Sequence, residues 1–257
     1  LLVFGGQGNG SGPDFIHAEV AAFDLDGTHE WTVAVPPDPA RGGIVPVCFA
    51  AYDGEHDAVL EFGEKAGEYE YATRRLALPP SALWSEPVPR EHAPPPRFGQ
   101  ATAYDPVRAR WLSFGGRWTY YVQYTYPTEY YDDLRAFHPG PSPAWEELPV
   151  SGARPPVRQF GQMLYDPATD RMVLFGGSLA SGMSHLHPEG TLSFLSDTWF
   201  LDPAADPPAW TPLAIASPGA RDGEVMALDT QRHRVLVFGG RGDAGITNDL
   251  WALSLDG

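Results

Sequence analysis

Arginine recurs in this sequence at a spacing that suits the recognition of carboxylates. Four arginines each precede a segment of small residues, and they are Arg41, Arg97, Arg158 and Arg221. A guanidinium group binds a carboxylate through two parallel hydrogen bonds, and several of them at one end of an acidic protein would create a local positive field. A second interpretation is open, because an arginine that recurs once per repeat is typical of a structural tie to backbone carbonyls or to an aspartate of the adjacent repeat.

Aromatic side chains gather in the stretch from residue 117 to 132, RWTYYVQYTYPTEYYD. Tyrosine combines a rigid ring with a polar tip at low entropic cost, which suits a contact surface. We therefore expect this stretch to bind a protein or peptide, or a carbohydrate, through Trp118, Tyr120, Tyr121, Tyr124 and Tyr126. The alternative is an extended hairpin whose rings pack on one another or on a neighbouring repeat.

Metal and nucleotide chemistry have weaker support. His185, His187 and Glu189 alternate in a second long loop, where an extended backbone would let both imidazoles face one ion. Solvated surface histidines explain the same pattern. The double glycines of the chain lead into loops and strands rather than helices, which argues against phosphate-binding loops. We expect no cofactor, no bound metal and no catalytic residue.

A repeated strand unit positions these residues. Copies of the motif VLFGG place phenylalanine at Phe4, Phe62, Phe114, Phe175 and Phe238, at separations of 58, 52, 61 and 63 residues. Each copy predicts a buried strand that stops at a glycine turn with positive φ, although Glu64 replaces the second glycine of the second copy. A strand of small residues that ends in an aspartate turn precedes most copies, and an Asp-Leu-Trp-like strand and a tryptophan-led strand follow them.

We call these four strands a, b, c and d. The chain supplies strands b to d of one set, then three complete sets, and finally strands a to c of a last set. Because successive strands alternate in direction, the b-to-c and d-to-a connections emerge at one end of each sheet, together with the arginines and the Tyr-rich stretch. The two incomplete sets predict association through open sheet edges, or further blades beyond these residues.

The double glycines, the spaced tryptophans and the pattern R-x-F-G, Y-D-P, V-L-F-G-G resemble kelch-repeat proteins, in particular bacterial ones. The resemblance spans the whole chain and implies an all-β, kelch-type β-propeller of about five blades of four antiparallel strands, as one domain over residues 1–257. It implies a binding module that acts through the face with the b-to-c and d-to-a loops.

The resemblance also implies alternatives. Galactose oxidase-like enzymes of this repeat type use copper with a cysteine-modified tyrosine, and Cys48 is the single thiol here. Plant specifier proteins carry an iron motif E-x-x-x-D-x-x-x-H; Glu129 and Asp133 match its first half, but His138 comes one residue late. A metal-dependent or carbohydrate-oxidising enzyme and a carbohydrate-binding propeller are therefore the competing functions.

The charge balance limits the class of partner. With 17 basic and 33 acidic residues the net charge is −16, which repels nucleic acid and anionic lipid surfaces. No apolar run reaches the length of a membrane span, and the first residues lack the pattern of a signal peptide. We expect a soluble protein without nucleic acid or membrane partners, in a compartment that the sequence leaves open.

Overall fold

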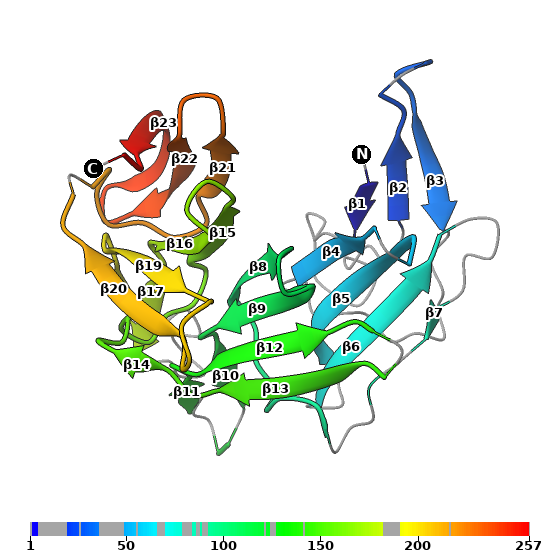
Figure 1. Ribbon diagram of the computed structural model, residues 1–257, viewed down its shortest axis with the longest axis horizontal. Coiled ribbons are helices and arrows are strands. Elements are labelled where there is room, and N and C mark those ends of the chain that lie inside the picture. The colour runs from blue at the N-terminus through cyan, green and yellow to red at the C-terminus, as the bar shows by residue number, and fades with distance from the viewer. Residues whose placement is uncertain are drawn as a thin grey trace. The chain divides into compact units, whose positions relative to one another are not determined.

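In this computed structural model, all regular elements among the described residues are β-strands (Figure 1). The chain divides into two compact units, Leu1–Phe98 and Gly99–Gly257. The structure describes residues 2–4, 20–25, 27–35, 49–54, 56–65, 70–78, 84–85, 88, 92–120, 122–123, 127–140, 142–181, 191–215 and 217–256.

The first unit contains two antiparallel sheets whose strands follow the order of the sequence. The first sheet comprises β1 (Leu2–Phe4), β2 (Val20–Phe23) and β3 (Trp31–Val35), and the second sheet comprises β4 (Phe49–Asp53), β5 (Ala58–Lys65), β6 (Glu70–Ala77) and β7 (Trp84–Ser85). Where the second copy of the motif lacks its second glycine, β5 continues to Lys65 and stays paired with β6. β22 (Arg234–Gly242) also continues past its double glycine, so the predicted stop of the strand at the glycines is wrong for these two copies.

The second unit contains three further sheets built in the same way. The third sheet comprises β8 (Ala101–Asp105), β9 (Arg110–Phe114), β12 (Leu134–His138) and β13 (Ala144–Leu148); the fourth comprises β15 (Gln162–Asp166), β16 (Arg171–Phe175), β19 (Thr198–Asp202) and β20 (Ala209–Leu213); the fifth comprises β21 (Val225–Asp229), β22 (Arg234–Gly242) and β23 (Gly245–Ser254). A short strand, β14 (Ser151–Gly152), adds to β20 in parallel.

The strand order agrees with the predicted sets, so the all-β prediction is confirmed. Every copy of the VLFGG motif lies in the second strand of its set, and Trp31 and Trp84 each begin a last strand. Among the described residues, the first sheet has no strand a and the fifth has no strand d. The second unit also contains two further hairpins. The pair β10 (Arg117–Thr119) and β11 (Thr128–Tyr130) is the extended hairpin given as the alternative for the Tyr-rich stretch, whereas the pair β17 (Ser178–Ser181) and β18 (Thr191–Phe194) was not predicted.

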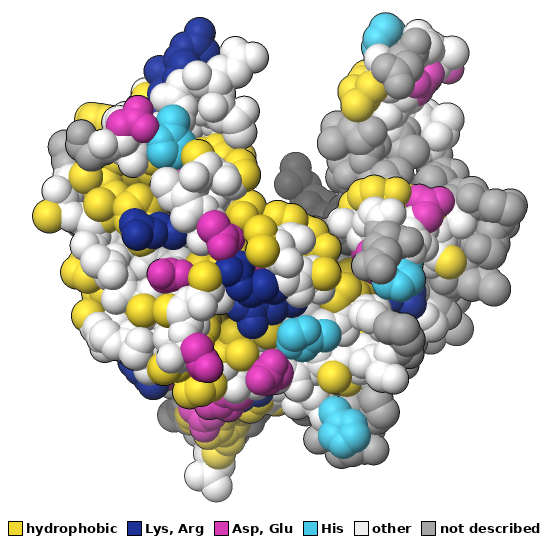
Figure 2. Space-filling view, viewed as in Figure 1, with side chains coloured by type: hydrophobic (Ala, Val, Ile, Leu, Met, Phe, Trp, Pro, Cys, Tyr) yellow, Lys and Arg dark blue, Asp and Glu magenta, His cyan; other side chains and the backbone are white. Residues whose placement is uncertain are grey.

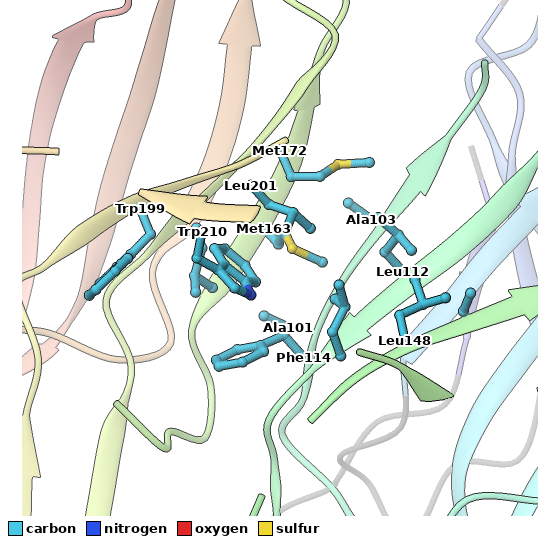
Figure 3. Packing of buried hydrophobic residues seen from close by; sticks show 13 residues of the cluster. Ala101, Ala103, Leu112, Phe114, Leu148, Met163, Met172, Trp199, Leu201 and Trp210 are labelled. Atoms are coloured by element: carbon cyan, nitrogen blue, oxygen red, sulfur yellow. The ribbon is translucent and has the colours of Figure 1, made fainter. Parts of the chain in front are cut away.

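One buried cluster of the second unit lies between the third and fourth sheets, and another lies between the fourth and fifth. Figure 3 shows Met163, Met172 and Trp210 of the fourth sheet pointing toward Leu112 and Phe114 of the third. The rings of Phe114 and Trp210 lie with centroids 5.0 Å apart, and both side chains are almost fully buried. The third and fourth sheets thus bury facing surfaces against each other, and this packing fixes the ends where their loops emerge.

Candidate functional site

Three β-hairpins project from the same end of the third, fourth and fifth sheets, and we call them the hairpin collar. They are formed by β10 (Arg117–Thr119) with β11 (Thr128–Tyr130), by β17 (Ser178–Ser181) with β18 (Thr191–Phe194), and by the end of β22–β23, where Gly240 pairs with Thr247 and Gly242 with Gly245. Each hairpin occupies a b-to-c connection, as predicted for the long loops.

Contacts between neighbours join the collar hairpins. The hydroxyl of Tyr130 donates to the carbonyl oxygen of Ala180 over 3.3 Å and accepts from the amide of the same residue, which ties the first hairpin to the second. The guanidinium of Arg241 lies over the ring of Phe194 at 5.7 Å, which ties the second hairpin to the third. The collar is therefore one connected surface.

The Tyr-rich stretch combines both interpretations offered by the sequence. Trp118 is 9% exposed, and its ring stacks on that of Tyr120 with centroids 6.4 Å apart. Tyr130 packs on the neighbouring hairpin, as the self-packing alternative predicts, whereas Tyr120 is only half-buried. Tyr121, Tyr124 and Tyr126 lie outside the described residues.

The three predicted arginines that the structure describes, Arg97, Arg158 and Arg221, are buried, and Arg158 and Arg221 hold the fourth and fifth sheets to their own loops. Arg158 is fully buried and donates from Nη1 to Gly176 O and Asp197 Oδ1, both at 2.9 Å, and from Nη2 to Asp197 Oδ2 at 2.7 Å. Arg221 repeats this arrangement with Gly239 and Asp249. These contacts favour the structural interpretation. The aspartate partner, however, comes from the arginine's own sheet, whereas an aspartate of the adjacent repeat was expected.

The ion pairs also lower the pKa values of the two aspartates, Asp197 and Asp249. Burial raises the pKa of Asp197, but the hydrogen bonds and the charge of Arg158 outweigh it and hold that pKa below its usual value. Hydrogen bonds from Arg221 and then Trp251 hold the pKa of Asp249 well below its ordinary range. Arg97 is also buried and donates to Pro95 O, while Arg41 lies in a segment that the structure does not describe.

The same arginine segments explain the double glycines. The amide of Gly116 donates to Arg158 O, and that of Gly177 donates to Arg221 O, both over 2.8 Å. A Cβ atom on Gly176 would lie 2.9 Å from Arg221 O, so the segment of the following sheet packs directly on the turn. The VLFGG motif and the repeated arginine are thus two sides of one contact between consecutive sheets.

Replacing Gly177 by alanine should destabilise the protein more than replacing Gly219. Both glycines have positive φ, 105° and 95°, but a Cβ on Gly177 would lie 2.7 Å from Gln159 O, whereas Gly219 has open space. The shared backbone strain cancels in the comparison, and crowding of a packed interior adds about 1–3 kcal/mol to the loss for Gly177→Ala. Urea unfolding of both variants measures this difference, and equal losses would contradict the interpretation of the turn as a packing contact.

Glu224 was missed by sequence reasoning. It is 1% exposed, and neither carboxyl oxygen has a hydrogen-bond partner. Its position directly precedes Val225, which pairs with Phe238 as Ala101 pairs with Phe114, so Glu224 occupies the place of Gln100. Burial, reinforced by the charge of Asp222, raises the pKa of Glu224 to about 8 despite nearby Arg221 and Arg158. The sequence offered one signal for this residue: the titratable Glu224 stands at the repeat position where Gln100, a neutral side chain of the same length, stands in the third sheet.

A polar network lies beside Glu224. The Asp222 carboxylate accepts from Ser178 Oγ at 2.7 Å and from Arg241 Nη2 at 2.9 Å, and Ser178 Oγ also accepts from Gln159 Nε2 at 3.3 Å. Gln159, Ser178 and Asp222 are at most 3% exposed. The network fastens the second and third hairpins of the collar to the underlying sheets, which favours a rigid surface.

Ion pairs also link the sheets at the opposite end. Arg108, in the turn after β8, donates to Asp170 in the turn after β15 at 2.8 Å. His233 lies 3.0 Å from Asp166, and hydrogen bonds with Asp256 and then Asp166 raise its pKa. On the face visible in Figure 2, acidic and basic side chains are interspersed rather than gathered by sign.

The metal candidates do not form a site within the described residues. Asp133 pairs with Arg135 at 2.5 Å and His138 with Glu146 at 3.1 Å. Asp133 precedes β12 and His138 ends it, so the strand separates them by roughly 16 Å, too far to share one ion. No group of three or more metal-ligating side chains occurs in this part of the chain. Cys48, His185, His187 and Glu189 lie outside it.

Comparisons with known proteins support the repeat type. No protein-family model matches the chain. Two proteins of Oryza sativa subsp. japonica are similar to it: putative adagio-like protein 2, with 34% identity over 115 residues, and adagio-like protein 1, with 34% identity over 116 residues. Each match covers 44% of this chain and 16% of the relative, so the similarity concerns a small part of those longer proteins.

Among solved structures, YjhT is similar with a TM-score of 0.67 and 14% identity, over 99% of this chain and 78% of that one. A fungal alcohol oxidase of the AA5 family, solved with copper, reaches a TM-score of only 0.44 at 14% identity, over 83% of this chain and 52% of that one. The likeness to YjhT and the repeated sheets show a kelch-type β-propeller fold, which confirms the predicted fold class. The number of blades and a bacterial origin stay predictions.

No helix in the described part of the chain is long and apolar enough to cross a membrane.

Proposed function

We propose that this protein is a binding module that recognises a protein or peptide through the hairpin collar. The observation that carries the proposal is the joining of three neighbouring hairpins by Tyr130, Ala180, Phe194 and Arg241 into one surface. Binding residues are found preferentially on loops held by a rigid scaffold, and the collar is such a set of loops.

Apolar side chains at the ends of the collar hairpins support a protein or peptide ligand. Ile246 is 88% exposed at the end of the third hairpin, and Val122 is 42% exposed between β10 and β11. Exposed aliphatic groups beside tyrosines are typical of the surfaces that bind polypeptides. Tyr120 lies two residues before Val122, so the aromatic and aliphatic groups belong to the same hairpin.

In this proposal the repeated arginines and the tyrosines have different roles. Arg158 and Arg221 hold the loops, because their guanidinium groups already bind carboxylates and carbonyl oxygens. We assign ligand contact to Tyr120, with the predicted Tyr121, Tyr124 and Tyr126, and a supporting role to Trp118. Arg41 and Arg97 stay predicted binding residues.

The test is a peptide selected from a displayed random library on the wild-type protein. Substitution of Tyr120 and Ile246 by serine should weaken its binding by about tenfold or more, because buried anchor side chains each contribute above 1 kcal/mol. Fluorescence anisotropy measures the affinity, and the melting temperature should change little. The control is Val107→Ser, which is 63% exposed in the turn at the opposite end of β8.

Retained affinity in the double variant, or an equal loss in Val107→Ser, would refute the proposal. Elemental analysis of the purified protein separates it from the enzymatic alternative. Stoichiometric copper, iron or zinc would favour a metal-dependent enzyme that uses the same face.

A further inference from the structure

Glu224 lies between the two glycine turns that lead into the second and third collar hairpins. A Cβ atom on Gly176 would lie 2.5 Å from Glu224 Oε1, and a Cβ atom on Gly240 would lie 3.1 Å from Glu224 Cβ. Gly176 stands between β16 and β17, and Gly240 begins the hairpin end of β22–β23. Because both turns pack on Glu224, a movement of either hairpin changes the surroundings of its carboxyl group.

The backbone amides of the Gly176–Gly177 turn are already engaged. The amide of Gly176 donates to Asp197 O over 3.3 Å, and that of Gly177 donates to Arg221 O over 2.8 Å. Among the described residues, neither carboxyl oxygen of Glu224 has a hydrogen-bond partner, and the residue is 1% exposed. A negative charge at this place would therefore lose its hydration without hydrogen bonds in return, which is costly.

The neighbouring charges do not compensate a Glu224 carboxylate. In the described part of the chain, the charged groups that act on it are Arg158 of the fourth sheet and Arg221 and Asp222 of the segment before β21. Both guanidinium groups are already paired with aspartates of their own sheets. Asp222 is itself an acid and adds repulsion. Ionisation of Glu224 is thus disfavoured as long as the two turns stay packed on it.

The contact that fastens the two hairpins lies beside this carboxyl group. Asp222, two residues before Glu224, accepts from Ser178 Oγ of the second hairpin at 2.7 Å and from Arg241 Nη2 of the third at 2.9 Å. Movement of either glycine turn would let water reach Glu224 and would also loosen this shared contact. Hydration of Glu224 and the closure of the two hairpins are therefore coupled.

We propose that the protonation state of Glu224 controls the second and third hairpins of the collar: the neutral acid keeps both glycine turns packed, and the ionised carboxylate opens them to water. In the opened state the hydrated carboxyl group has an ordinary pKa. The closed state is therefore favoured at low pH and is progressively lost as the pH rises from that ordinary value through the raised pKa of the packed group. The switch acts in the ligand-free protein, and an effect on peptide affinity would rest in addition on the function proposed above.

Hydrogen–deuterium exchange of the ligand-free full chain tests the switch. Wild type and Glu224→Gln are compared at about pH 6 and about pH 9, because the ratio of their rates at one pH removes the intrinsic pH dependence of exchange. In β17–β18 and the hairpin end of β22–β23 this ratio should rise about tenfold or more between the two pH values, since each unit of pKa difference between closed and open states changes the opening equilibrium about tenfold. In β8, β9 and β12 it should stay constant.

The matched control is Glu129→Gln, at an exposed position of the first hairpin, which should give a constant ratio throughout the chain. If Glu224→Gln fails to fold by circular dichroism, the wild-type hairpins are compared with β8 and β9 of the same molecule across the same pH range. A ratio in the two hairpins that does not change with pH overturns the proposal. An equal rise in all sheets of the second unit also overturns it, because ionisation would then unfold the whole unit. Peptide binding does not enter this measurement, so its failure is distinct from failure of the proposed function.

Discussion

Arg158→Met is expected to lower the free energy of unfolding by about 2–3 kcal/mol, because it leaves the buried carbonyl oxygen of Gly176 without this donor and removes the charged partner of Asp197. The guanidinium group is fully buried and satisfies Pro156 O and Gly176 O as well as both oxygens of Asp197. Methionine retains much of the apolar stem but none of the donors. Chemical denaturation followed by tryptophan fluorescence measures the loss.

Arg232→Met is the matched control. Arg232 also pairs with an aspartate, Asp229 at 3.2 Å, but its side chain is 64% exposed. Exposed pairs contribute about 0–1 kcal/mol, so this variant should remain close to wild-type stability. If Arg158→Met were as stable as Arg232→Met, the repeated arginine would not be the structural tie described above, and a ligand-binding role would regain support.

Glu224→Gln is expected to remove a strong pH dependence of stability. In the folded protein the pKa of Glu224 is raised to about 8 by burial and by Asp222, against 4.5 for an ordinary glutamate. Between these two values the unfolded chain releases the proton while the folded chain keeps it, so wild-type stability falls as pH rises. The loss is complete above the folded pKa and amounts to at most about 5 kcal/mol.

Glutamine is the appropriate replacement because Gln100 occupies the same register position in the third sheet. The free energy of unfolding is measured for both proteins from pH 5 to pH 9, a range that spans about four units around the expected titration. The difference between variant and wild type should grow with pH and then level off. The exposed Glu129→Gln serves as control, and a difference for Glu224→Gln that stays flat with pH would show that Glu224 is not protonated in the folded state.

The periodic elements were predictable from sequence because their physical causes are local. A β-branched and aromatic run before glycine favours a strand wherever it occurs, and all five copies form strands. The role of Arg158 was less determined, since an arginine pattern fits a ligand as well as an aspartate. Only the folded register brings Asp197 within reach of it.

The joining of the collar hairpins, the burial of Glu224 and the exposure of Phe238 depend on contacts between residues distant in sequence. The pairing of Tyr130 with Ala180 joins hairpins of different sheets, and no local pattern encodes it. Glu224 differs from Gln100 by one polar group. The raised pKa of Glu224 follows from its burial, which cannot be read from the sequence. Phe238 is 52% exposed although Phe114, at the same position of the motif, is fully buried, so the motif alone does not determine burial.

Hydrogen–deuterium exchange with a bound selected peptide tests the collar as the contact surface most directly. At saturation, the account predicts protection in β10–β11, β17–β18 and the Gly240–Thr247 end of β22–β23. The turns between β8 and β9, β15 and β16, and β21 and β22 should exchange at unchanged rates. Protection of those turns, with no change in the collar, would contradict the account and place recognition at the opposite end of the sheets.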